Sequence, residues 1–436
     1  MHLAATPSPA HEPGPDPDLQ RAIGEAQALV EQDALITTLQ TFVRIPSVRD
    51  PHQPHGSERD MADAVCALLE AWGMEFIRWD VAPDRPNIVV NLIGAHGAGP
   101  TLILEGHMDV VTAGARSAWS FDPFAGDIVD GRLRGRGACD MKGGLTAMLY
   151  AARALHAAGN PFAGTLRLAI LADEEGLMRG AKAFVAAGYV ADADAAIICE
   201  PEGDRVCIAQ KGAIRLHATF SGRMSHGCMP DEGANPVAAL GRAIVGCLEL
   251  EQQVLSRHAV HPLLGRFSLT PTVAIAGERE QGNVLSARAE LLLDVRTAPE
   301  HDHDELVDEV TLVLQRAAAT VADVTVAVET VDDRPATDTA PDAAIVLAAC
   351  AAHRAETGVD PDIGGVPGST DGTIFWAATG LPLVTWGPGE TTLPHQADES
   401  VNVAEVQRYA RMYVGAAIRF LHVQRDNATP ASGHEG

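Results

Sequence analysis

Three apolar runs of this sequence each end in side chains that can bind metals or move protons. Unpaired carboxylates are costly to bury, and several of them at one place repel one another unless a cation lies between them. The carboxyl ends of the strands in an open α/β sheet are where ligands bind, so these side chains would meet there. The sequence therefore predicts a metal site. Its candidate residues are Glu105, His107 and Asp109 after residues 101–104, Asp173, Glu174 and Glu175 after 165–171, and Glu200 after 195–199.

Histidine and aspartate two residues apart are common in surface turns, but His107 and Asp109 follow a run that reads as a buried strand. We therefore assign His107 as a metal ligand and Asp109 as the acceptor of its second ring N–H. Neighbouring residues at a strand end point to opposite sides. One of Glu174 and Glu175 can thus coordinate a metal while the other activates a water as general base, and this reasoning leaves open which does which.

A glycine-rich segment, residues 135–144, leads into a predicted helix. It matches neither the dinucleotide-binding nor the phosphate-loop pattern, so Asp140 at the head of the helix is instead a candidate to bridge two metals. His395 on its own has the pattern of a loop histidine. The runs 301–305 and His52-x-x-His55 have closer spacing for a metal, but they lie in predicted loop or helix-cap sequence and are the weaker alternatives.

The segments that position these residues predict an α/β fold with a mixed sheet. Nearly continuous apolar runs, typical of strands buried on both faces, alternate with amphipathic helices. From about residue 213 the order becomes β-α-β-β-α-β, which predicts a small ferredoxin-like domain inserted into the larger one. The larger domain has predicted strands at 87–94, 101–105, 165–172, 195–199 and 382–386 and helices at 145–158 and 340–355. The inserted domain has predicted strands at 214–221, 268–276, 287–295 and 324–331 and helices at 236–255 and 305–318.

Composition excludes several classes of protein. The formal net charge of −26 makes nucleic acid and anionic membranes poor partners, and no apolar stretch is long enough to span a bilayer. The seven cysteines are scattered without a C-x-x-C pair, which argues against a disulfide framework or a cysteine zinc site. The start of the chain lacks the apolar segment of a signal peptide, so we expect a reducing, cytoplasmic location.

The expected domain limits are a disordered leader over 1–20, a catalytic domain over 21–212 and 335–424, the inserted domain over 213–334 and a mobile tail over 425–436.

Five motifs carry a resemblance that covers most of the chain. They are Gly106-His107-Met108-Asp109-Val110-Val111, Gly135-Arg136-Gly137-Ala138-Cys139-Asp140-Met141-Lys142-Gly143-Gly144, Ala172-Asp173-Glu174-Glu175-Gly176, Cys199-Glu200-Pro201 and Leu393-Pro394-His395-Gln396-Ala397-Asp398-Glu399. In this order they resemble the zinc hydrolase family of acetylornithine deacetylase, succinyl-diaminopimelate desuccinylase, aminoacylase and glutamate carboxypeptidase.

The resemblance implies a site with two zinc ions per chain, which would polarise the substrate carbonyl and lower the pKa of a water. Zinc is the default by the usual order of metal affinities, with cobalt or manganese as substitutes. Glu174 would be the catalytic base. The implied ligands are Asp140 between the two ions, His107 and Glu200 on one ion, and Glu175 and His395 on the other.

The resemblance also implies that the inserted domain is a lid that carries a homodimer interface. In the segment 222–227, His226 resembles a histidine that reaches a neighbouring active site and stabilises an oxyanion. Asn283 and Arg296 resemble residues that bind the substrate's carboxylate, for which a guanidinium is well suited. The alternative for Arg296 is a structural arginine paired with Asp294 or Glu290.

A Gly/Ser/Thr-rich segment resembles the family's substrate loop through Gly368, Ser369 and Thr370. Pro367 replaces one of the two glycines that many relatives have there. This departure concerns the pocket for the acyl group or side chain, so the resemblance does not define that pocket.

The sequence favours an amidohydrolase that removes the acyl group from an N-acyl amino acid. A dipeptidase or a glutamate-type carboxypeptidase would use the same chemistry and is the alternative, so the expected partner is a small N-acyl amino acid or short peptide. A non-catalytic binding module is disfavoured because every expected ligand and the base are present. A serine hydrolase is disfavoured because residues 368–372 have Thr370 at the centre and lack the G-x-S-x-G pattern.

Overall fold

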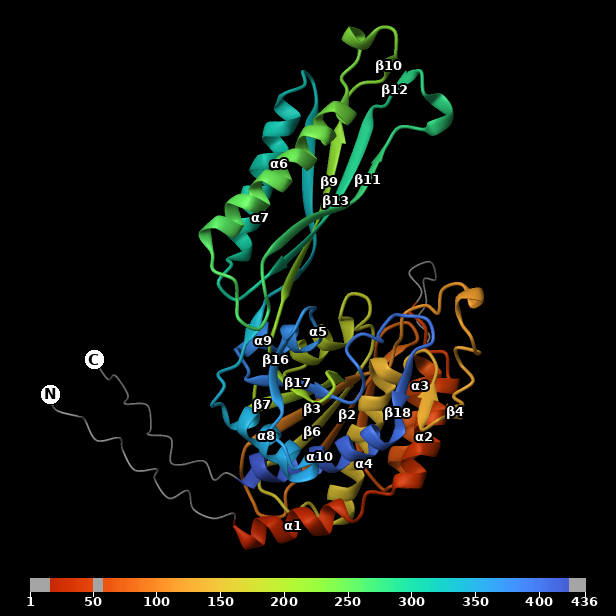
Figure 1. Cartoon of the computed structure of the whole chain (residues 1–436), viewed down its shortest axis with the longest axis vertical. Helices are drawn as coiled ribbons and strands as arrows, with labels where there is room; N and C mark the ends of the chain where they lie inside the picture. Colours follow the sequence, from red (N-terminus) through yellow and green to blue (C-terminus); the bar gives the residue numbers. More distant parts are fainter. Residues whose placement is uncertain (1–15, 50–57, 423–436) are drawn as a thin grey trace, which may run out of the picture.

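The computed structural model describes residues 16–49 and 58–422, which form two units joined at one end (Figure 1). The larger unit contains a nine-stranded sheet, and a smaller, elongated unit stands above it. The smaller unit, here called the lid, begins with β9 (Gly212–Ser221) and ends with β14 (Thr325–Arg334). The α/β fold with an inserted lid is therefore confirmed.

The strands of the large sheet include all those predicted from apolar runs. They are β1 (Phe76–Ala82), β2 (Arg85–Ile93), β3 (Thr101–His107), β6 (Thr165–Leu171), β7 (Ala195–Pro201), β8 (Arg205–Gln210), β15 (Thr337–Asp338), β16 (Asp362–Val366) and β17 (Leu383–Gly387). Their spatial order is β1-β2-β6-β3-β7-β17-β8-β15, with β16 paired to β8. The strands β6, β3, β7 and β17 are parallel, whereas β1 and β2 extend the sheet antiparallel. The sheet is thus mixed, and β17 lies between two strands that precede the lid in the chain.

Helices cover both faces of this sheet because its strands are apolar on both sides. In β2, for example, Ile88 and Val90 belong to the core on one face and Val89 to the core on the other. One face carries α1 (Pro17–Gln27), α2 (Gln32–Arg44), α3 (Arg59–Ala71), α4 (Gly143–Ala157), α8 (Ala344–Thr357) and α10 (Val403–His422), and the other carries α5 (Arg179–Ala186) and α9 (Gly372–Thr379). Among the described residues, no helix has both the length and the apolar character needed to cross a bilayer.

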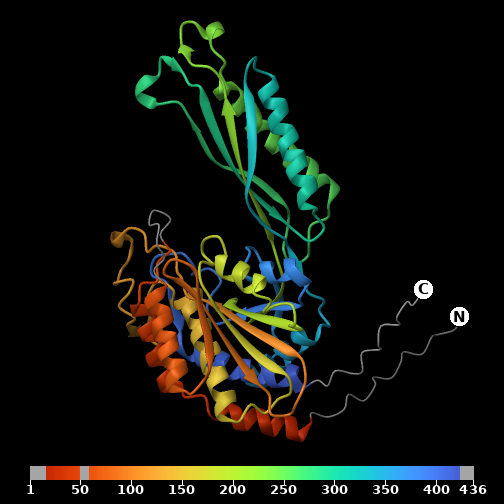
Figure 2. The same ribbon diagram turned by 180° about the vertical axis from the view of Figure 1, so that it is seen from behind.

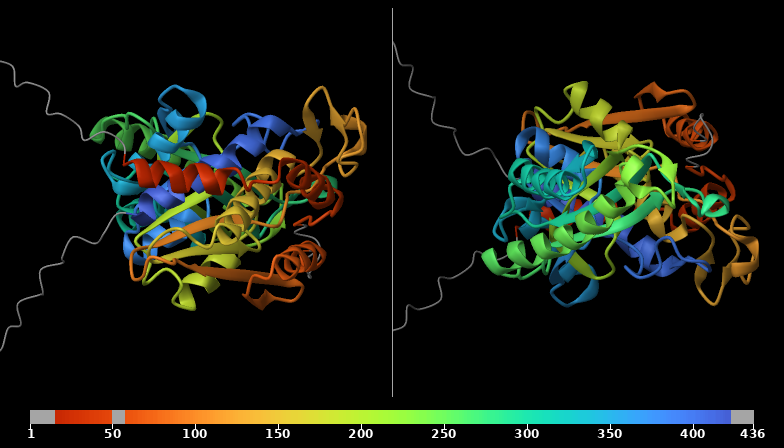
Figure 3. Two further views of the ribbon diagram at one scale, coloured as in Figure 1. Left: turned by 90° about the horizontal axis from the view of Figure 1, so that it is seen from below. Right: turned by 90° about the horizontal axis from the view of Figure 1, so that it is seen from above.

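Helix α1 differs from the leader expected over 1–20, because residues 17–20 are already helical. Pro17 suits a first helical position, and the Asp16 side chain caps the helix by accepting a hydrogen bond from the Asp18 N–H at 2.9 Å. Ile23 and Ala26 pack into the core, so α1 lies across the bottom of the larger unit (Figure 3). The rest of the expected leader and the tail over 425–436 lie outside the described residues.

The lid is a four-stranded antiparallel sheet with two helices packed on one face (Figure 2). Its strands lie in the order β11-β13-β9-β14, which is the ferredoxin-like arrangement. A two-stranded ribbon extends from its far end (Figure 1). The remaining lid elements are α6 (Pro236–Arg257), β11 (Ser268–Ala276), β13 (Arg288–Thr297), α7 (His303–Ala319) and the ribbon of β10 (Ser225–His226) and β12 (Val284–Leu285).

Candidate metal centre and substrate pocket

Five side chains that can bind metals converge at the carboxyl end of the parallel strands. His107 is the last residue of β3, and Glu200 is the penultimate residue of β7. Asp140 lies in η2 (Ala138–Lys142), an irregular turn in front of α4. Glu175 follows β6, and His395 lies in the loop between β17 and β18 (Ser400–Asn402). The fold thus brings together residues that are far apart in the sequence.

The five side chains form two groups that share Asp140. In the first, His107 Nε2 lies 3.3 Å from Asp140 Oδ1 and 3.2 Å from Glu200 Oε1. In the second, His395 Nε2 lies 3.3 Å from Asp140 Oδ2 and 3.0 Å from Glu175 Oε2. Each oxygen of Asp140 thus faces a different histidine, which is the geometry of a carboxylate that can bridge two cations.

The environment of these groups fits divalent metal ions. Burial raises the pKa of Glu200 to about 8, and hydrogen bonds to Asp140 and Glu175 raise the pKa of His395 to about 10. Buried carboxylates at this density must bind protons or a cation. Imidazole nitrogens and carboxylate oxygens are ligands that zinc and related ions take, so the donor set favours such a cation.

Asp109 acts on His107 in a different way from the one expected. His107 Nδ1 lies 2.9 Å from the main-chain carbonyl of Asp109 but 3.6 Å from its carboxylate. A carbonyl oxygen only accepts hydrogen bonds, so Nδ1 donates to it and Nε2 is the ring nitrogen left to bind a metal. Nε2 is buried and has no hydrogen-bond partner among the described residues. The Asp109 carboxylate instead accepts hydrogen bonds from the main-chain N–H groups of Glu174 and Glu175, both at 3.1 Å.

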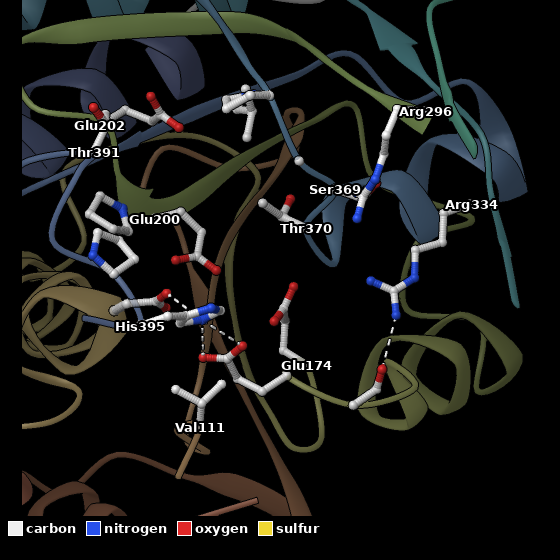
Figure 4. A pocket seen from close by; sticks show the side chains of 18 of the residues that line it. Val111, Glu174, Glu200, Glu202, Arg296, Arg334, Ser369, Thr370, Thr391 and His395 are labelled. Carbon is white, nitrogen blue, oxygen red and sulfur yellow. Dashed lines mark hydrogen bonds and ion pairs between the residues drawn. The ribbon is translucent and has the colours of Figure 1, made fainter. Parts of the chain in front are cut away.

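Glu174 belongs to neither ligand group, yet it is buried and lines the pocket beside them (Figure 4). Burial raises the pKa of its carboxyl well above the usual range, although His107 acts against this shift. A carboxylate with a raised pKa that faces the pocket is suited to accept a proton as a general base.

A buried carboxylate holds the turn that carries Asp140. Glu399 accepts hydrogen bonds from the main-chain N–H groups of Cys139 at 2.9 Å and Asp140 at 3.1 Å, and it pairs with the buried Arg136. The sequence motif contains Glu399, but its position in the sequence does not indicate this partner. Such contacts restrict the placement of Asp140.

A second buried network holds the loop that carries Glu174 and Glu175. Arg85 Nη1 lies 2.6 Å from Glu58 Oε1 and 3.1 Å from Asp173 Oδ1, and Glu58 also accepts a hydrogen bond from the Asp173 N–H at 3.2 Å. Sequence reasoning missed Glu58 and Arg85. The arginine that opens the apolar strand β2 was the available signal, because a buried guanidinium requires acidic partners.

A pocket of about 480 Å³ adjoins the metal-binding side chains. The predicted residues Gly368, Ser369, Thr370 and Arg296 line it. The Ser369 hydroxyl donates to the Lys211 carbonyl and the Thr370 hydroxyl to Gln210 Oε1, so both are engaged within the chain. Sequence reasoning missed three charged residues of the pocket wall, which are Glu202, Arg215 and Arg334.

His226 and Asn283 do not line this pocket. They lie together on the ribbon at the far end of the lid, where Gly227 N–H donates to the Asn283 carbonyl at 2.7 Å (Figure 1). Both side chains are exposed. The structure therefore separates them from the other predicted site residues of the same chain.

The alternative metal-binding runs are placed elsewhere. Among the described residues, the run 301–305 contributes to neither group of potential metal ligands. His303 instead lies 2.5 Å from Asp333 Oδ1 and 2.7 Å from the Thr297 hydroxyl. His52 and His55 lie outside the described residues.

Comparison with known proteins agrees with this site. The model of peptidase family M20/M25/M40 matches residues 103–419. The chain is 32% identical over 395 residues to a succinyl-diaminopimelate desuccinylase of Methylobacterium radiotolerans. The matched region covers 87% of this chain and 95% of that protein. A probable succinyl-diaminopimelate desuccinylase of Staphylococcus aureus is 29% identical over 84% of this chain and 94% of its own length.

Solved structures share the fold at lower sequence identity. The dipeptidase Dug1p of Saccharomyces cerevisiae has a TM-score of 0.75 at 17% identity, covering 93% of this chain and 99% of the other. The Bacillus subtilis protein YXEP, described as a dinuclear metal-binding peptidase of the M20 family, has a TM-score of 0.65 at 18% identity. The match covers 89% of this chain and 99% of the other. The chain therefore belongs to peptidase family M20/M25/M40 and is a metal-dependent hydrolase of amide bonds.

Proposed function

We propose that this enzyme hydrolyses the amide bond of an N-acyl amino acid with the help of two zinc ions. The observation that carries this proposal is the shared Asp140, whose two oxygens face the two histidines. Glu174 lies beside them and belongs to neither group of ligand atoms. The similarity to succinyl-diaminopimelate desuccinylases supports an acyl amino acid as substrate. The seven free cysteines favour a reducing, cytoplasmic setting.

The proposed roles follow from the positions of the side chains. His107 and Glu200 would hold one ion, Glu175 and His395 the other, and Asp140 both. When bound, the two ions would polarise the substrate carbonyl and lower the pKa of a water. Glu174 would take the proton of the attacking water and deliver it to the leaving amine.

The test of this function is amine release from a panel of substrates by the zinc-loaded enzyme. The panel holds N-formyl, N-acetyl, N-succinyl and N-carbamoyl amino acids together with dipeptides, and Glu174→Ala serves as the blank. Release from acyl amino acids that is absent from the blank is the expected result. Release from dipeptides alone would replace the proposal by a dipeptidase, and no release with two zinc ions bound would contradict both.

We further propose that His226 serves the active site of a second copy in a homodimer that forms through the lid. The support is its place on the exposed ribbon, away from the pocket of its own chain. His226→Ala should therefore lower kcat by roughly 10²- to 10³-fold, as expected for the loss of an oxyanion donor. The matched control is His217→Ala, which removes a lid histidine that pairs with Glu290.

Mixing two inactive variants provides a sharper measurement. His226→Ala keeps Glu174, and Glu174→Ala keeps His226, so a mixed dimer contains one complete site. Activity should return when the two variants are allowed to exchange subunits. An unchanged kcat in His226→Ala, or no recovery in dimers shown to be mixed, would remove His226 from the proposed site.

A further inference from the structure

A row of alternating charges crosses three neighbouring strands of the lid where it meets the pocket. Arg215 on β9 lies opposite Asp294 on β13 and opposite Asp332 on β14. Two residues further along β13 and β14 follow Arg296 and Arg334. All three arginines line the pocket, whereas the two aspartates do not.

Each aspartate pairs with two of the arginines. Asp294 accepts two hydrogen bonds from Arg296, at 2.6 and 3.0 Å, and its Oδ2 lies 3.7 Å from Arg215 Nε. Asp332 Oδ2 lies 2.7 Å from Arg334 Nε and 3.5 Å from Arg215 Nη1. Arg296 is thus fixed by two hydrogen bonds, whereas Arg334 forms an ion pair with Asp332 without a hydrogen bond to it. Arg215 connects the two pairs.

Arg334 is the buried member of the row, with 6% of its surface exposed. One terminal nitrogen, Nη2, donates to the carbonyl of Gly176 at 3.0 Å, next to the loop of Glu174 and Glu175. Its other terminal nitrogen, Nη1, has no hydrogen-bond partner in the described part of the chain. Figure 4 shows this nitrogen pointing into the pocket toward Glu174 and Thr370. A buried cationic donor directed at an open space is expected to meet an anion.

The row has more positive than negative charges, which favours the binding of such an anion. Three guanidinium groups face two carboxylates, and the exposed Lys182 adds a further positive charge 3.7 Å from Asp332. The register places Ala213 between Arg296 and Arg334, so their Cα atoms are roughly 10 Å apart, two strand spacings. Two guanidinium groups at this separation, each tied to its own aspartate, suit two carboxylates better than one.

We propose that Arg334 is a specificity-determining residue that binds a second carboxylate of the substrate, in addition to the one expected at Arg296. The inference rests on the proposed function, because it takes the substrate to be an N-acyl amino acid. The second carboxylate belongs either to the acyl chain or to the side chain of the amino acid.

The test is a calorimetric titration of the zinc-loaded enzyme with matched pairs of ligands that differ by one carboxylate. Succinate against butyrate probes the acyl side, and glutamate against norvaline probes the amino-acid side. In the wild-type enzyme, the ligand with the additional carboxylate of at least one pair should bind about 10- to 100-fold more tightly, as for a hydrogen bond between charged groups. The pair that shows this preference identifies the side of the amide that faces Arg334.

Arg334→Met should reduce this ratio to less than about threefold. The matched control is Arg288→Met, which removes an exposed arginine of the same lid sheet that pairs with Glu290 at 2.8 Å, and it should keep the wild-type ratio. A purely structural role of Arg334 would weaken both members of a pair equally and leave the ratio unchanged. If Arg334→Met does not fold, Arg334→Lys decides, because lysine can still pair with Asp332 but cannot donate to Gly176 and to a ligand together.

A wild-type ratio near one for both pairs, or an unchanged ratio in the Arg334 variants, would overturn this proposal. The outcome is separable from that of the substrate panel. Carboxylate preference without hydrolysis of any substrate would contradict the proposed function alone, whereas hydrolysis without carboxylate preference would contradict only the role of Arg334.

Discussion

Glu174→Gln should lower kcat roughly 10²- to 10⁴-fold while the metal content of the enzyme stays at the wild-type level. The amide of glutamine fills nearly the same space as the carboxylate but cannot take a proton from water. Metal content should be unaffected because Glu174 belongs to neither of the two groups of ligand atoms. The measurements are kcat on the best substrate of the panel and the zinc content by elemental analysis.

The matched control for this variant is Glu390→Gln, which changes an exposed glutamate that pairs with Arg132 on the surface. It should keep both activity and zinc. Loss of zinc from Glu174→Gln would mean that Glu174 is a ligand, and that the roles of Glu174 and Glu175 are exchanged.

Asp140→Asn should remove metal from both positions and lower activity by roughly 10³-fold or more. Each oxygen of Asp140 faces one histidine, at 3.3 Å in both cases, so a single substitution weakens two ligand groups. Several kcal/mol of transition-state stabilisation depend on the metal ions, and each 1.4 kcal/mol corresponds to about a factor of ten in rate. Zinc content after dialysis and kcat are measured together.

Asp204→Asn is the matched control for this substitution, because Asp204 is exposed and pairs with Arg408 away from the pocket. A normal zinc content in Asp140→Asn would show that Asp140 does not bridge the two positions. Loss of only one zinc ion would restrict Asp140 to a single ligand group.

The fold and part of the candidate site could be predicted from the sequence because buried parallel strands leave a clear pattern. An apolar run predicts the strand, and the first polar residues after it are predicted to lie at the edge of the sheet where ligands bind. His107 and Glu200 were found in this way, and the structure brings them within 3.2 Å of each other. Glu174 and Glu175 follow a strand in the same manner.

Other site residues lack such a local signal. His395 lies eight residues after Gly387, the last residue of β17, so it is not among the first polar residues that follow the strand. Only the tertiary fold brings it to Asp140. The charged row of the lid lies on strands that alternate in polarity, where arginines are usually solvent-facing. A signal was nevertheless present, because Asp294 and Arg296 on one strand repeat the spacing of Asp332 and Arg334 on another. His226 and Asn283 on the lid ribbon lie away from the pocket of their own chain, and their positions in the sequence do not indicate that distance.

The position of β17 between β7 and β8 determines when the enzyme can become complete during its synthesis. A ribosome makes β7, β8 and the whole lid before it makes β17, so the growing chain carries two unpaired strand edges at the middle of its main sheet. Such edges promote association with other chains and are recognised by chaperones. His395 emerges only after β17, so the second ligand group forms last. Chains that stop before His395 therefore lack one ligand of the second group.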